Sequence, residues 1–166
     1  MCTIDLSPAD EADPDEILEL LRCSYGQLLA RDHPVELVGK ALPVMCEPVP
    51  RLLRGAHYVL ARRQGHVVGM GGWSRETPFG RPGVDGLGHV RHLAVHPKAL
   101  RSGVGRAIFG WIVGTAQAAQ VTRLSCLSTQ GAVPFFAAMG MQAQGDVLLH
   151  LGPGVSLPAM QMCWQG

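Results

Sequence analysis

Charge and long apolar runs are both scarce in this sequence, and each shortage excludes a class of protein. Charged residues make up 16% of the 166 residues, and 14 Lys and Arg offset 13 Asp and Glu to give a net charge of +1. Nucleic-acid-binding domains are usually clearly basic, so we expect no nucleic-acid partner. No apolar run approaches the roughly 18 residues of a membrane span, and the first residues lack the basic-then-apolar pattern of a secretion signal. We therefore expect a cytoplasmic protein that does not associate with membranes.

The cysteines and histidines do not form a metal-binding pattern. The five cysteines are scattered and never spaced as C-x-x-C, which argues against both a disulfide framework and a zinc ribbon. His89, His92 and His96 are spaced by three and four residues, which would suit one face of a helix. In a strand, however, we expect His92 to point away from His89, and His96 precedes a proline. We therefore expect no metal ion.

The apolar content is sufficient for one domain built around one sheet. Hydrophobic residues make up 47% of the sequence, and a chain of this length buries roughly 70% of its unfolded surface on folding. We expect a single domain over residues 1–166. Strands are expected at residues 2–6, 57–62, 66–73, 90–95, 123–127, 144–151 and 158–164, and helices at 103–120 and 131–139, with a Gly- and Pro-rich loop at 74–88. Strands interleaved with helices indicate a mixed α/β (α+β) domain.

The N-terminal part carries two helix signals. Asp13 can cap a helix, Pro14 suits its first position, and Glu16 stands three residues after the cap. A second, shorter helix is expected to begin at His33-Pro34. Residues 43–55 include three prolines, so we expect them to be irregular or only partly helical.

A glycine-rich turn between a strand and a helix is the most informative part of the sequence. Gly103 and Gly105 let the backbone approach a ligand closely, and the free amides of the following helix would form an anion site. Arg101 and Arg106 add positive charge, so a phosphate or pyrophosphate is the expected ligand. The third glycine of a dinucleotide-binding fingerprint is missing, because Ile108 stands at its position. The P-loop pattern G-x-x-x-x-G-K-[ST] is also absent.

Two segments together resemble the GCN5-related N-acetyltransferase (GNAT) superfamily. Leu93-Ala94-Val95-His96-Pro97 followed by Arg101-Ser102-Gly103-Val104-Gly105-Arg106 is similar to the acetyl-CoA motif of that family. The segment Ala132 to Met141 is similar to the family's A-x-x-F-Y-x-x-x-G-F pattern. The sequence departs from the family at Leu100, where Gln or Arg is usual, at Phe136, where Tyr is usual, and at Met141, where Phe is usual.

The resemblance implies a fold and a cosubstrate. It predicts a central, mostly antiparallel mixed sheet of six to seven strands with about four flanking helices, whose fourth and fifth strands splay apart. The pantetheine arm of acetyl-CoA would lie in that opening, paired with main-chain groups of Leu93, Ala94 and Val95. Its pyrophosphate would sit on the amides of Arg101, Ser102, Gly103, Val104, Gly105 and Arg106, and Phe135 would contribute to the same cofactor site.

The resemblance also implies an acid–base arrangement. A carboxylate often stands early on the fourth strand of the family, and the matching position here is His89. An imidazole is well suited to accept a proton at neutral pH, so His89 is the candidate base, with Asp85 and Glu76 as competitors. By strand alternation we expect His89, Arg91, Leu93 and Val95 to share one face.

Phe136 leaves the general-acid position vacant, because a phenyl ring has no proton to donate. The enzyme would then work without an acid, or Tyr25, Tyr58 or a water would replace it. The resemblance predicts an N-acetyltransferase that acts on a small-molecule or protein amine by direct attack on the thioester, as a monomer or a homodimer. The alternative is a catalytically weak acyl-CoA-binding or regulatory module of the same fold.

Overall fold

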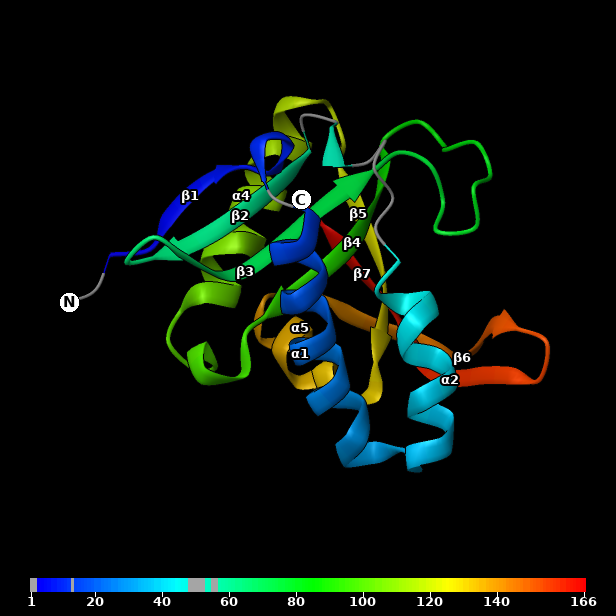
Figure 1. Cartoon of the computed structure of the whole chain (residues 1–166). Coiled ribbons are helices and arrows are strands. Elements are labelled where there is room, and N and C mark those ends of the chain that lie inside the picture. The colour runs from blue at the N-terminus through cyan, green and yellow to red at the C-terminus, as the bar shows by residue number, and fades with distance from the viewer. Residues whose placement is uncertain (1–2, 13, 48–52, 55–56) are drawn as a thin grey trace.

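One seven-stranded sheet, in the order β1-β2-β3-β4-β5-β7-β6, forms the centre of the computed structural model, which describes residues 3–12, 14–47, 53–54 and 57–166 (Figure 1). The first four strands pair antiparallel in sequence: β1 (Asp5–Pro8), β2 (Tyr58–Arg63), β3 (His66–Ser74) and β4 (Leu87–Val95). β5 (Arg123–Thr129) is parallel to β4, and β7 (Val155–Gln165) lies antiparallel between β5 and β6 (Gln142–Gly152). The expected mixed, mostly antiparallel sheet is confirmed.

Helices cover both faces of this sheet. α1 (Pro14–Asp32) crosses one face, and α2 (Val35–Met45) continues from it to contact β6 and β7 (Figure 1). α4 (Val104–Ala118) covers the opposite face, where α5 (Val133–Ala138) also packs. Short 3-10 turns complete the order at η1 (Ala9–Glu11), η2 (Pro97–Ala99) and η3 (Gln130–Ala132). Among the described residues of 43–55, residues 43–45 belong to α2 and Leu53 is also helical.

The two apolar layers follow from the two sequence periodicities. In α1 the buried residues Ile17, Leu20 and Leu21 recur at helical spacing, so one stripe of the helix faces the sheet. In β2 the side chains alternate: Tyr58 and Leu60 pack in the α1 layer, whereas Val59 and Ala61 pack in the α4 layer. The strands β2, β3 and β4 therefore each contribute to both cores.

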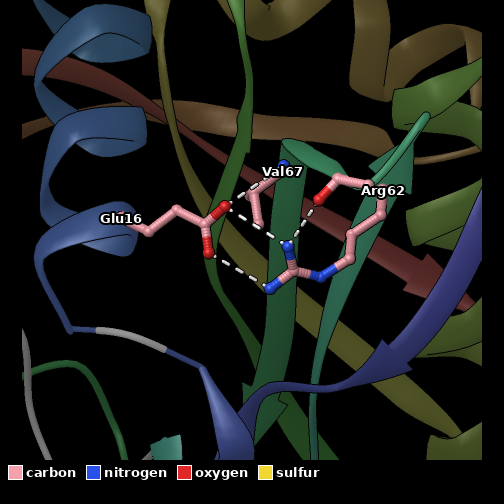
Figure 2. Close-up of polar contacts among 4 residues, drawn as sticks. Glu16, Arg62 and Val67 are labelled. Carbon is pink, nitrogen blue, oxygen red and sulfur yellow. Dashed lines mark hydrogen bonds and ion pairs between the residues drawn. The ribbon is translucent and has the colours of Figure 1, made fainter.

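An ion pair attaches the start of α1 to the β2–β3 hairpin (Figure 2). The Glu16 carboxylate accepts hydrogen bonds from Arg62 Nη2 at 3.1 Å and Nη1 at 3.3 Å, and from the Val67 amide at 3.4 Å. Arg62 Nη1 also donates to the Gly65 carbonyl oxygen at 2.9 Å. The two-point contact orients α1 on the sheet. The expected cap of this helix, Asp13, lies outside the described residues and stays a prediction.

Gly72 on β3 has no side chain, which leaves space for a contact between a side chain of β2 and a side chain of β4. Tyr58, Gly72 and Arg91 stand in one row across the three strands. A Cβ at Gly72 would lie 2.5 Å from Tyr58 Cγ and 2.5 Å from the His57 carbonyl oxygen, so the tyrosine ring occupies the space above the glycine. The ring extends over β3, and Tyr58 Oη lies 3.1 Å from His92 Nδ1 on β4.

We predict that Gly72→Ala destabilises the fold by about 1–3 kcal/mol, because the added methyl group must displace the buried Tyr58 ring or the backbone. Gly39→Ala is the matched control: that glycine lies inside α2, a Cβ there meets nothing within 4 Å, and the helix gains about 0.5–1 kcal/mol. Denaturant unfolding measures both changes. Equal stability of Gly72→Ala and wild type would show that Tyr58 does not depend on this space.

Candidate active site

The opening between β4 and β5 is the central feature of the candidate site. The two strands pair only at Leu87↔Arg123, Gly88↔Leu124 and His89↔Ser125, although both strands are described to their ends. Beyond these pairs β4 remains bonded to β3 and β5 remains bonded to β7. The expected splaying of the fourth and fifth strands is therefore confirmed, and it leaves one edge of β4 without a strand partner.

The main chain of Leu93 and Val95 is directed at this opening. The His96 amide donates to the Val68 carbonyl oxygen at 2.8 Å, so the polar groups of His96 point toward β3. Because the main-chain groups of a strand alternate between its two neighbours, those of Leu93 and Val95 point toward β5, where the strand has separated. An extended ligand can pair with this edge as another strand would.

A β-bulge at His92 interrupts the alternation of side chains along β4. Arg91 stands opposite Gly72, and Ala94 stands opposite Met70, so His92 and Leu93 share one partner position on β3. His92 has a φ of +51°, a conformation that non-glycine residues rarely adopt. The extra residue reverses the parity of the strand, and the side chains after it lie on the opposite face from the one that regular alternation predicts.

Two predictions about β4 are therefore wrong. His89, Arg91, Leu93 and Val95 do not share one face, because Leu93 and Val95 pack in the α4 layer with Val90. His92 does not point away from His89, because its ring contacts Tyr58 in the α1 layer, the face on which His89 also lies. The bulge instead brings His89, Arg91 and His92 together on the α1 face.

The turn after β4 presents free amides at the start of α4. Gly103 is the N-cap residue in the left-handed conformation, with a φ of +87°, and no side chain caps the helix. The first intrahelical bond is donated by Ala107 to the Gly103 carbonyl oxygen at 3.0 Å. The amides of Val104, Gly105 and Arg106 therefore have no acceptor within the helix, and they meet the positive end of its dipole. This arrangement suits an anion.

Packing and hydrogen bonds hold that turn in place. Ser102 Oγ donates to the Ala99 carbonyl oxygen at 2.6 Å, and Arg63 Nη2 reaches the Ser102 carbonyl oxygen at 3.4 Å. A Cβ at Gly105 would lie 2.9 Å from Phe135 Cε2, so the ring rests against the glycine. The two sequence motifs are thus in contact, while Arg101 and Arg106 remain exposed beside the free amides.

Phe136 lies in the apolar core of the α4 layer and is 5% exposed. Its ring meets Phe109 and Phe135 edge-on, at centroid distances of 6.3 Å and 5.2 Å. Three aromatic rings therefore pack where the second motif meets α4. The role assigned to Phe136 from the sequence, a vacant general-acid position, stays a prediction.

The α1 face of the opening gathers polar groups that keep neutral forms at pH 7. Burial lowers the pKa of His92 to about 4 and also lowers the pKa of His89, and in both cases the positive charge of Arg91 acts in the same direction. Burial raises the pKa of the Tyr25 and Tyr58 hydroxyls, so both keep their protons. His89 Nε2 is buried and has no hydrogen-bond partner among the described residues.

The competitors of His89 lie outside β4. Asp85 is exposed in the loop before β4, and Glu76 is partly buried just after β3. Reasoning from the sequence overlooked Arg91 as a functional residue. The available signal was a guanidinium inside an otherwise apolar and histidine-containing strand, where a charge is costly.

The described residues contain no group of three or more His, Cys, Asp or Glu side chains that is arranged to hold a metal ion. None of the helices among them is both long and apolar enough to cross a membrane.

We predict that stability falls between pH 6.5 and pH 4 partly through His92. The unfolded state binds a proton near pH 6.5, whereas the folded state resists it until about pH 4, so acid favours unfolding in this window by about 2–3 kcal/mol. His92→Asn tolerates a positive φ and does not titrate, so its stability should depend less on pH over this range, as measured by urea unfolding. His66→Asn, at an exposed hairpin position, is the control. Equal pH dependence in wild type and His92→Asn would contradict this role.

Comparisons with known proteins agree with this geometry. The acetyltransferase (GNAT) family matches residues 15–141, whereas a search of curated proteins finds no match. A GCN5-related N-acetyltransferase structure from Rhodopseudomonas palustris superposes with a TM-score of 0.84 at 22% identity, covering 100% of this chain and 98% of that one. PaiA N-acetyltransferase from Thermoplasma acidophilum, in complex with coenzyme A, gives 0.72 at 11% identity and 99% coverage of both chains. Because the family match spans most of the sequence, the chain belongs to the GNAT acetyltransferase family.

Proposed function

We propose that this acetyltransferase transfers the acetyl group of acetyl-CoA to a primary amine by direct attack on the thioester. One observation carries the proposal: the unpaired edge of β4 ends at the free amides of α4. An acetyl-CoA molecule has the same two parts in the same order, an extended amide-containing arm and a pyrophosphate. The opening and the turn therefore suit one ligand that occupies both.

The proposed binding mode assigns main-chain groups to the cosubstrate. Leu93, Ala94 and Val95 supply the strand edge for the pantetheine arm, and the amides from Arg101 to Arg106 receive the pyrophosphate. Phe135, which rests on Gly105, borders the same turn. Backbone recognition of this kind depends on shape, so it tolerates the departure at Leu100, which is exposed.

His89 is the proposed base. An ammonium acceptor must lose a proton before its nitrogen can attack, and the lowered pKa of His89 keeps the imidazole neutral and able to accept that proton at pH 7. The new N–C bond forms as the thioester carbonyl becomes tetrahedral. The C–S bond then breaks, the electron pair leaves with the CoA sulfur, and the proton that the adduct nitrogen loses ends on that sulfur, giving the amide and the free CoA thiol.

The departing sulfur does not require Phe136 to act as an acid. A thiol that resembles cysteine has a pKa of about 8.5, so a thiolate is an acceptable leaving group near neutral pH. Tyr25 is the protonated hydroxyl best placed to assist. Tyr25 packs against the core on the α1 side of the sheet, burial keeps its hydroxyl protonated by raising its pKa, and the positive charge of Arg91 acts on it in the opposite direction.

We predict that Arg106→Glu weakens acetyl-CoA binding about tenfold or more, because it replaces an attractive charge beside the free amides with a repulsive one. Wild type should gain about 2.7 kcal/mol of stability at a hundredfold excess of acetyl-CoA over its dissociation constant. Thermal unfolding at several ligand concentrations measures both. Arg123→Glu, at the exposed start of β5, is the matched control and should bind normally. Normal binding by Arg106→Glu would remove the pyrophosphate from this turn.

We predict that wild type releases CoA and forms N-acetylated product with at least one class of primary amine, and that His89→Ala lowers the rate about 10²–10⁴-fold. The wild-type rate should fall in acid, below the ordinary histidine pKa, as His89 becomes protonated, and His89→Ala should lose that limb of the profile. Acetyl-CoA affinity should not change. An unaltered profile in His89→Ala, with loss of activity in Asp85→Ala or Glu76→Gln, would assign the base elsewhere.

The same assay distinguishes the proposed enzyme from the second candidate function, an acyl-CoA-binding module. A catalytically weak acyl-CoA-binding module is favoured by Phe136, which offers no proton in the position where the family usually has tyrosine. Tight acetyl-CoA binding without product from any amine would support the module and overturn the proposed enzyme.

A further inference from the structure

Arg91 is a partly buried cation inside the central sheet, on the α1 face of the opening. Its neighbours in sequence on β4 are apolar or neutral, and its side chain takes a place that most strands fill with an apolar group. Burying a guanidinium is costly unless an acceptor or an anion compensates it. The surroundings of Arg91 therefore indicate what the site is built to bind.

One hydroxyl orients the guanidinium. Ser74 Oγ is nearly buried and donates its proton to the Glu76 carbonyl oxygen at 2.8 Å, so its lone pair is left to accept from Arg91 Nη1 at 3.1 Å. Among the described residues this is the hydrogen bond formed by the Arg91 side chain. A guanidinium has five N–H donors, so most of the donors of Arg91 remain available to a ligand.

The groups that surround Arg91 leave its charge uncompensated. The positive charge of Arg91 acts on the pKa of Tyr25, Tyr58, His89 and His92: it adds to the lowering by burial at the two histidines and opposes the raising by burial at the two tyrosines. At pH 7 the two tyrosines are protonated and the two histidines are neutral, so none of the four carries a negative charge. An anionic substrate group is therefore favoured here, and a second cation is disfavoured.

The spacing on β4 sets how far the anion lies from the reacting amine. His89 and Arg91 are two residues apart on one face, a separation of about 7 Å along the strand. The bulge begins at the next residue, His92, where the strand edge turns to the acetyl donor. A carboxylate on Arg91 and an amine between His89 and the thioester must then be close neighbours within one molecule.

We propose that Arg91 binds the carboxylate of the acceptor and that the acceptor is a free α-amino acid. The inference rests on the proposed function, and it names the substrate class of the same site. In a free amino acid a single carbon joins amine and carboxylate, which fits the short separation of Arg91 and His89 along β4. A polyamine would bring charge of the wrong sign, and the first residue of a protein has an amide in place of the carboxylate.

Pairs of amino acids and their carboxamides test the proposal, because the two members share the amine and the side chain. L-Leucine with leucinamide and L-methionine with methioninamide are suitable, and kcat/KM is measured for each. We expect the acids to exceed the amides about 10- to 100-fold, mainly through KM, as for loss of a charge-assisted pair. The amine of an amide loses its proton more readily, so amine basicity does not explain a preference for the acid.

Variants of Arg91 assign the preference to its side chain. Arg91→Gln should abolish the preference for acids and leave acetyl-CoA affinity unchanged. Arg91→Lys should keep only part of the preference, because lysine has the charge but lacks the planar guanidinium that donates two hydrogen bonds to a carboxylate. Arg31→Gln, at an exposed position of α1, is the matched control and should behave as wild type. If Arg91→Gln does not fold, Arg91→Lys and the wild-type comparison still decide.

Calorimetric titration of L-leucine or L-methionine into the CoA-bound protein supplies a readout that needs no turnover. Acetylation of amides as fast as acids, or an acid preference that survives in Arg91→Gln, would overturn the assignment of Arg91 and leave the proposed N-acetylation intact. Arg91-dependent binding of amino acids without any acetylation would support the assignment and overturn the proposed catalysis. If the protein neither binds amino acids through Arg91 nor acetylates any amine, both the assignment of Arg91 and the proposed N-acetylation are overturned.

Discussion

Separation of β4 from β5 after three residue pairs is the constraint on which the site depends. Main-chain N–H and C=O groups inside a protein need partners, and a strand in the middle of a sheet normally finds them on both sides. Here the outer part of β4 is bonded only to β3, and the part of β5 after Ser125 is bonded only to β7. The sheet therefore has an internal edge that an extended, amide-containing molecule can complete. Helices on both faces limit access to that edge.

The bulge at His92 connects the two faces of this edge. Before it, His89 and Arg91 face α1, and after it, Leu93 and Val95 pack toward α4. In the proposed reaction, the donor and the acceptor can therefore approach the same few residues from different directions. A positive φ at a histidine is strained, and the contact of its ring with Tyr58 helps to hold it. Gly72 makes that contact possible, because a side chain there would fill the space of the tyrosine ring.

Placement of α1 is the second requirement of the acceptor side. The Glu16–Arg62 pair is only partly buried, so its contribution to stability is modest. The pair fixes the first turn of α1 on the β2–β3 hairpin (Figure 2). Tyr25 lies farther along the same helix. Ser74 connects the last residue of β3 to Arg91, so the loop that follows β3 begins at the acceptor side of the site.

Local signals determined much of the fold and the donor site. The β2–β3 hairpin follows from Gln64-Gly65, which both adopt a positive φ, and the anion site follows from Gly103 before an amphipathic helix. Such features depend on residues that are close in sequence, so composition and spacing are enough to predict them. The second motif likewise placed Phe135 near the first, and the two are in contact.

Only the tertiary structure decided which side chains of β4 face the acceptor. The prediction that alternate residues share one face holds only for a regular strand. Nothing in the sequence His89-Val90-Arg91-His92-Leu93 marks the extra residue of the bulge, because that residue is a histidine rather than a glycine. The contact that helps to hold His92 comes from Tyr58, 34 residues away, and the hydroxyl that orients Arg91 comes from another strand. Sequence patterns report local conformation, whereas parity after a bulge depends on pairing with a neighbouring strand, and that pairing exists only in the folded sheet.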